Sequence, residues 1–156
     1  MASRMLVGSR KGLLILEPKG KGAWEITRQA FLGQPVSMVM HDPRDGALYA
    51  ALNLGHFGAK LHRSDDGGAN WTEVGVPAFP KAEGEDAPSV GMIWALEPAG
   101  ADMPGAIWAG TMPAGLFRSD DRGVTWLCNA PGEAIPSKKH WFGGGNDAPG
   151  LHSIAI

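Results

Sequence analysis

The chain has 156 residues, of which 44% are hydrophobic and 19% charged, and its net charge at pH 7 is −2. This is the composition of one folded domain with a core, and its charge balance gives no reason to expect nucleic acid or a membrane surface as a partner. Gly (23 residues) and Pro (12 residues) are abundant, which favours short strands and tight turns over helices. Cys128 is the only cysteine, so a disulfide within the chain is excluded.

Residues 1–30 are predicted to form three strands. The first apolar stretch, residues 5–7, is too short for a signal peptide or a membrane span, because Gly8 and charged residues follow it. We therefore expect a cytoplasmic protein. Gly12 separates this stretch from a second apolar run, and Trp24 marks the start of a third.

Residues 36–76 are predicted to form four strands, and residues 90–130 repeat them. Strand-like segments cover residues 36–43, 47–53, 60–63 and 72–76 in the first set. They cover residues 91–98, 105–111, 115–118 and 127–130 in the second set. An acidic residue followed by Pro ends the first segment of each set, and Pro43 and Pro98 lie 55 residues apart.

An eight-residue sequence, which we call the octet, joins the last two strands of each set. Residues 64–71 and 119–126 share the pattern Ser-x-Asp-x-Gly-x-x-Trp at the same spacing of 55 residues, as expected for a repeat fold. The pattern suits a tight turn: Asp accepts backbone N–H groups, Ser adds a local hydrogen bond, Gly permits a positive φ and Trp covers the sheet. The alternative is that the octet residues are catalytic or bind calcium. Repetition argues against this, because an active site needs one set of residues in one place, whereas the octet occurs twice. We assign the structural role to Ser64, Asp66, Gly68, Trp71, Ser119, Asp121, Gly123 and Trp126.

The octet resembles the Asp-box of the BNR and sialidase-like repeat proteins. The whole chain resembles the N-terminal part of bacterial propellers of the WD40/YVTN/BNR-like class. This resemblance implies an all-β fold, a β-propeller segment of about three four-stranded blades. Residues 1–30 would be the last three strands of blade 1, residues 36–76 blade 2, residues 90–130 blade 3, and residues 151–156 the first strand of blade 4.

Closed propellers have more blades than this chain supplies. Our preferred interpretation is that the chain is the N-terminal part of a longer protein. The alternative is a head-to-tail homodimer, in which the last strand of each copy completes blade 1 of the other.

The resemblance also implies where a site would lie. In such families, ligands bind at the end of the blades opposite the Asp-boxes. The segments expected there are residues 9–11, 54–58, 79–89 and 131–152. From them we choose five candidate ligand-binding residues, in which Arg10 would hold a carboxylate or phosphate and the imidazoles would exchange hydrogen bonds. These candidates are Arg10, His56, His140, Asp147 and His152.

Two other interpretations of the Gly-rich segment 143–150 stay open. It can be a plain loop between blades. It can also bind a metal through His56, His140, Asp147 and His152, although their spacing matches no standard ligand motif. The Gly-Lys-Ser/Thr sequence of a phosphate-binding loop is absent. We predict no metal and no cofactor.

The leading hypothesis for function is a scaffold that binds a protein, a carbohydrate or a small anionic ligand. The alternatives are a glycoside hydrolase of sialidase-like type and an assembly factor for a larger complex. A sialidase needs a Tyr nucleophile, and the only Tyr, Tyr49, falls within a predicted strand. Carboxylates for hydrolysis could come from Glu83, Glu85, Asp86 or Asp147, but no spacing singles out a pair, so we name no catalytic residue.

Overall fold

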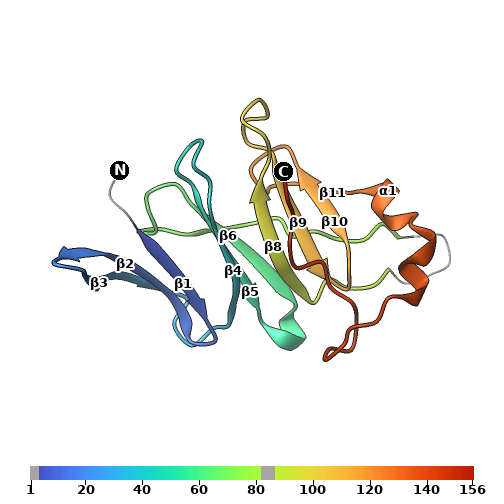
Figure 1. The fold of residues 1–156 in the computed structure, drawn as a ribbon, viewed down its shortest axis with the longest axis horizontal. Coiled ribbons are helices and arrows are strands. Elements are labelled where there is room, and N and C mark those ends of the chain that lie inside the picture. Colours follow the sequence, from blue (N-terminus) through green and yellow to red (C-terminus); the bar gives the residue numbers. More distant parts are fainter. Residues whose placement is uncertain (1–3, 82–86) are drawn as a thin grey trace.

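In the computed structural model, which describes residues 4–81 and 87–156, three antiparallel sheets stand side by side (Figure 1). The first sheet contains β1 (Met5–Ser9), β2 (Gly12–Gly20) and β3 (Ala23–Ala30). The second contains β4 (Val36–His41), β5 (Leu48–Asn53), β6 (Ala59–Ser64) and β7 (Thr72–Val74). The third contains β8 (Met92–Pro98), β9 (Ile107–Met112), β10 (Leu116–Ser119) and β11 (Leu127–Cys128). Strands that follow one another in the sequence pair within each sheet, which confirms the expected all-β fold of blade-like units.

The helical elements of the described residues are short turns that lie outside the strands. They are η1 (Gly55–Phe57), α1 (Ala130–Glu133) and η2 (Pro136–His140). The last two lie in the segment between β11 and the C-terminus, which we had expected to be a loop. No helix in the described ranges is long and apolar enough to span a membrane.

Two apolar layers join the three sheets. Leu13 and Ile15 of β2, two residues apart and therefore on one face, pack in a cluster with Leu48 and Leu52 of β5. A larger cluster joins the second and third sheets, and its biggest members are Tyr49, Leu61, Ile93 and Phe117. All of these side chains are at most 1% exposed, and burial of each contributes about 1.5–3 kcal/mol.

The connections separate into two ends of the molecule. The β4–β5 and β8–β9 connections and the two octets lie at one end, which we call the octet end. The β1–β2 and β5–β6 connections and the loop of residues 141–150 lie at the other, lower end in Figure 1, which we call the loop end. This separation is the one that the propeller interpretation predicts.

The first octet is held by a compact set of hydrogen bonds. Ser64 Oγ donates to Asp66 Oδ1 (2.8 Å) and accepts from the backbone N–H of Gly68 (2.8 Å). Asp66 also accepts from the backbone N–H and the side-chain amide of Asn70, at 2.9 and 2.7 Å. Gly68 has φ +90°, which a Cβ would strain. These bonds lower the pKa of Asp66 to about 2, chiefly through the backbone N–H of Asn70.

The second octet repeats this arrangement. Ser119 Oγ donates to Asp121 Oδ1 and accepts from Gly123 N–H, both at 2.8 Å, and Gly123 has φ +86°. Thr125 replaces Asn70, and its hydroxyl donates to Asp121 at 2.6 Å. The hydrogen bonds expected from the sequence are therefore present in both octets.

Each octet Trp packs toward the preceding sheet. The ring of Trp71 lies edge-on to Phe31, which follows β3, with centroids 5.1 Å apart. Trp126 Nε1 donates to the carbonyl of Gly75, which follows β7, at 3.0 Å. The octets therefore fix both the turn within a sheet and the packing of one sheet on the next.

An arginine in the β4–β5 connection ties the second sheet to the third. Arg44 pairs with the buried carboxylate of Asp42 at 2.6 Å. Its remaining N–H groups donate to four backbone carbonyls of the β8–β9 connection, at 2.7–3.2 Å: those of Ala99, Gly100, Met103 and Ala106. The hydrogen bonds from Arg44 hold the pKa of Asp42 below its usual range.

The strand expected over residues 151–156 is not formed. Leu151 N–H donates to Thr111 O of β9 at 2.9 Å, but residues 151–156 have no strand assignment. A strand needs a continuous set of hydrogen bonds to a neighbour. This segment lies beside the third sheet, but past Leu151 no backbone hydrogen bond joins it to a described strand. The fourth strands are also shorter than expected: β7 ends at Val74 and β11 at Cys128.

Candidate functional site

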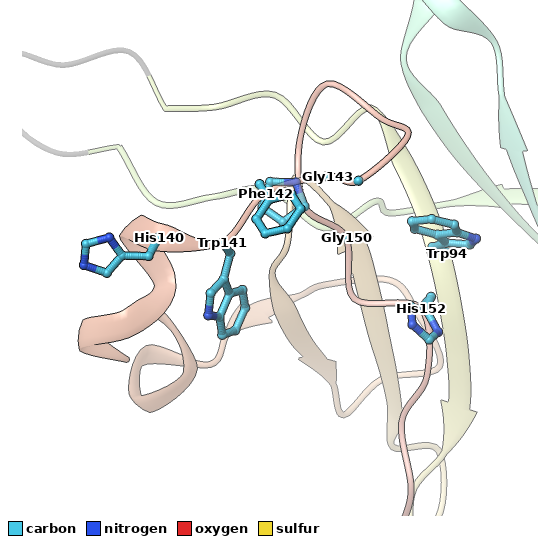
Figure 2. Close-up of a pocket in the computed structure, with 9 residues that line it drawn as sticks. Trp94, His140, Trp141, Phe142, Gly143, Gly150 and His152 are labelled. Atoms are coloured by element: carbon cyan, nitrogen blue, oxygen red, sulfur yellow. The ribbon is translucent and has the colours of Figure 1, made fainter.

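An open cavity of about 550 Å³ lies at the loop end, between β8 and the segment that follows η2. Aromatic rings, imidazoles and glycines make up nearly all of its wall (Figure 2). The nine lining residues are Trp94, His140, Trp141, Phe142, Gly143, Gly144, Pro149, Gly150 and His152. None of them is acidic.

Trp94 forms the part of this cavity that belongs to the sheet. It sits in β8 at a break in register with β9, between Ile93 and Ala95, so the strand presents its ring at the loop end. The ring of His152 lies edge-on to it, with centroids 5.8 Å apart. A Cβ on Gly150 would lie 2.5 Å from the Trp94 ring, so glycine is needed for this close approach.

The opposite wall is held in place by the helical turns. Asn129 caps α1 by accepting from the backbone N–H of Gly132 at 2.8 Å. Glu133 pairs with Lys138 at 2.5 Å, and the Lys138 ammonium lies 5.8 Å from the centroid of the Phe79 ring. The turn that carries Trp141 is thereby anchored to the third sheet and to the segment before β8.

Two large aromatic side chains on this wall face solvent. Trp141 is 40% exposed and Phe142 is 85% exposed. Leaving such rings in water is unfavourable, and exposed aromatic groups beside a cavity are typical of binding surfaces. In Figure 2, Phe142 and Gly143 lie between Trp141 and the Trp94–His152 pair, whereas His140 projects to the far side of Trp141.

A second open cavity, of about 680 Å³, lies at the loop end of the first and second sheets. It is formed by the β1–β2 turn, the β3–β4 connection and the β5–β6 connection. Its lining residues are Arg10, Gly33, Gln34, Pro35, Asn53, Leu54, Gly55 and Phe57.

The five candidate residues chosen from the sequence do not form one site. His140 and His152 line the first cavity, and Arg10 lines the second. His56 is an exposed residue of η1 whose ring lies edge-on to that of Phe57, a residue of the second cavity. Asp147 is exposed and lines neither cavity.

The sequence interpretation missed the aromatic residues that define the first cavity. Trp94 falls in the strand expected over residues 91–98, and Trp141 and Phe142 are not among the five candidate residues. The strand registers place Trp94 at the position that Ser37 has in the other repeat, because each stands at the register break in the first strand of its sheet. A large aromatic residue where the other repeat has a small polar one marks a local departure from the shared packing.

Neither cavity is lined by an acidic residue or by a metal-binding cluster of the described residues. No three His, Cys, Asp or Glu side chains come together for a metal ion among residues 4–81 and 87–156. The acidic residues Glu83, Glu85 and Asp86 lie outside the described residues.

Tyr49, the only tyrosine, faces the core rather than a cavity. Its side chain is 1% exposed, and its hydroxyl donates to the carbonyl of Arg122 at 3.4 Å. Burial raises its pKa. A nucleophilic role of the sialidase type is incompatible with this position.

No protein-family model and no curated protein sequence matches the chain. Two solved β-propeller structures are similar to it. Ycf48 bound to a D1 peptide aligns with a TM-score of 0.53 and 18% identity, over 82% of this chain and 38% of that chain. A GH74 xyloglucanase from Xanthomonas campestris aligns with a TM-score of 0.54 and 21% identity, over 80% of this chain and 18% of that chain. The chain therefore has the fold of a propeller segment and spans well under half the length of either protein.

Proposed function

We propose that the chain is part of a protein-interaction scaffold that binds a peptide segment of a partner protein at the loop end. The observation that carries the proposal is the acid-free cavity around Trp94, with Trp141 and Phe142 exposed on its opposite wall. Aromatic walls of this kind bind prolyl and apolar side chains.

The glycines of the cavity support a peptide as the ligand. Gly143, Gly144 and Gly150 leave backbone groups close to the cavity, where they can exchange hydrogen bonds with a peptide main chain. His140 and His152 add hydrogen-bonding groups at its two sides. The likeness to Ycf48, whose structure holds a peptide, agrees with this proposal at the level of the fold. An assembly factor would be a special case of it.

A carbohydrate is the second candidate ligand. Trp and Phe faces also suit the apolar faces of sugar rings, and the second similar structure is a xyloglucanase. Hydrolysis is less well supported than binding, because glycosidases use two carboxyl groups beside the scissile bond and no acid lines this cavity.

We also propose that the two octets are Asp-boxes and that the chain is related to BNR-like repeat proteins. The matching hydrogen bonds of Ser64 and Ser119 support this relation. This relation gives the octets a structural role and assigns no catalytic or binding site to the octet end.

The test is a selection of peptides from a random display library, followed by calorimetry of the selected peptide and of xyloglucan oligosaccharides. We expect Phe142→Ala to weaken peptide binding by about tenfold, the loss typical of an aromatic contact residue. Because Phe142 is 85% exposed, this substitution leaves folding intact. Trp94→Ala should weaken binding further.

Trp24→Ala is the control, because Trp24 is a tryptophan as exposed (41%) as Trp141 of the cavity wall (40%) but lies on β3 of the first sheet. Binding should be unchanged in this variant. Selected peptides that bind equally well to the Phe142→Ala and Trp94→Ala variants would refute the proposed site. Tight binding of the oligosaccharides without any peptide would favour the second candidate.

A further inference from the structure

The second cavity has a lining unlike that of the first, and it shares no residue with it. Its one charged residue is Arg10, and its side-chain amides are those of Gln34 and Asn53. No acidic side chain is among its lining residues. The cavity thus presents one full positive charge that its own wall does not neutralise.

Arg10 stands on a well-fixed turn. Ser9 Oγ accepts from the backbone N–H of Lys11 (3.1 Å) and donates to the carbonyl of Gly12 (3.0 Å). Gly33 N–H donates to Lys11 O at 3.0 Å, which joins the turn to the β3–β4 connection. A Cβ on Gly12 would lie 2.8 Å from the carbonyl of Ala30, so the turn packs closely against the end of β3.

The part of the wall at the end of β5 holds a second donor. Asn53 Oδ1 accepts from the backbone N–H of Gly55 at 3.2 Å, and Asn53 N–H donates to Pro35 O at 3.0 Å. With its amide oxygen engaged, the Nδ2 group of Asn53 is the part left for a ligand. The guanidinium of Arg10 takes part in no hydrogen bond or ion pair within the described part of the chain.

Apolar surface completes the cavity. Phe57 is 79% exposed, and Leu54 and Pro35 lie beside it on the wall. Side-chain N–H donors on one part of the wall and an exposed aromatic ring on another suit a ligand that has an anionic head and an apolar body.

We infer that this second cavity binds an organic carboxylate, with the carboxylate paired to Arg10 and hydrogen-bonded to Asn53, and the apolar body against Phe57. Guanidinium and carboxylate form two parallel N–H···O bonds, which is the strongest ion pairing available to the wall. The site is independent of the peptide site proposed above.

The test uses 3-phenylpropionate as the probe and 3-phenylpropionamide as its neutral counterpart. Heteronuclear NMR of the side-chain amides follows Gln34 and Asn53 directly. We expect saturable shifts of both amides with 3-phenylpropionate, and binding about tenfold weaker with the amide, because a charge-assisted pair is lost.

Arg10→Gln should weaken 3-phenylpropionate binding by about tenfold, whereas Lys11→Gln should change it less than about twofold. Both residues are exposed on the same turn, but only Arg10 lines the cavity, so the two variants separate a specific contact from general attraction to positive charge. The inference is overturned if neither amide shifts at the highest soluble concentration, if the acid and its amide bind equally, or if both variants lose the same affinity. Since the residues of the first cavity take no part, each of these outcomes leaves the peptide proposal standing.

Discussion

The octet end and the loop end differ in how fully their polar and aromatic groups are used within the molecule. At the octet end, Asp66 and Asp121 each accept several hydrogen bonds, and Arg44 donates to a carboxylate and four carbonyls. At the loop end, Phe57 and Phe142 lie 79% and 85% exposed, and two cavities open to solvent.

The repeats differ in the same way. The two octets have nearly the same hydrogen bonds, even where Asn70 is replaced by Thr125. The β5–β6 connection carries a helical turn and the exposed Phe57, whereas the β9–β10 connection is short and its Gly115 packs against Phe117. What is repeated therefore builds the scaffold, and what is not repeated supplies the surface for a ligand.

The substitution with the largest expected effect on stability removes Arg44, the arginine that joins the second and third sheets. Arg44→Met should lower the free energy of unfolding by about 3–5 kcal/mol, because Asp42 is left buried and unpaired. Urea unfolding measures the loss. Arg10→Met is the matched change at the loop end and should alter stability by less than about 0.5 kcal/mol.

The double variant Asp42→Asn with Arg44→Met adds a second check. It leaves no unpaired buried charge, so it should recover part of the stability lost in Arg44→Met alone. If Arg44→Met were no more costly than Arg10→Met, the ion pair at the octet end would not be structural, and the contrast between the two ends would fail.

A smaller loss of stability is expected when a glycine at the contact between the second sheet and the second octet is replaced. A Cβ on Gly75 would lie 2.1 Å from the carbonyl oxygen of Val124 in the second octet, so backbone has to move. Gly75→Ala should therefore cost about 1–3 kcal/mol in thermal or urea unfolding. Gly145→Ala, at the loop end, meets nothing within 4 Å and should be close to neutral. Equal costs for the two variants would contradict the close contact of octet and sheet.

Much of the fold could be predicted from the sequence, because the signals are local and occur twice. The octet fixes a turn through residues four apart or closer, such as Ser64 and Gly68, and two copies set the register of both sheets. The segment expected as a strand at residues 151–156 has no strand assignment, for a physical reason. An apolar pattern such as Ile154–Ile156 favours a strand, but pairing requires a neighbour that a local pattern does not reveal.

Less of the candidate site could be predicted. The sequence pointed to the loop end, where both cavities described above lie, yet it grouped Arg10 with His152, which line different cavities. Grouping depends on which connections come together in space, and loop positions have no periodicity to indicate this. The register break that turns Trp94 toward the loop end is likewise a property of the paired strands rather than of the residue.

The smallest expected effect concerns the acid stability that the octet carboxylates provide. Hydrogen bonds from Thr125 lower the pKa of Asp121 to about 2 from its ordinary 3.8. A carboxylate with a depressed pKa contributes stability that is fully present above the ordinary value and is lost as the pH falls through about 2. Asp121→Asn should therefore be less stable than the parent at neutral pH, and the difference should shrink between about pH 4 and pH 2.

Asp147→Asn, at the loop end, is the control, and its stability should follow that of the parent at each pH. Urea unfolding at a series of pH values measures both variants. A constant difference for Asp121→Asn across this range would mean that the charge of Asp121 adds nothing to the octet, and that its side chain contributes equally whether ionised or not.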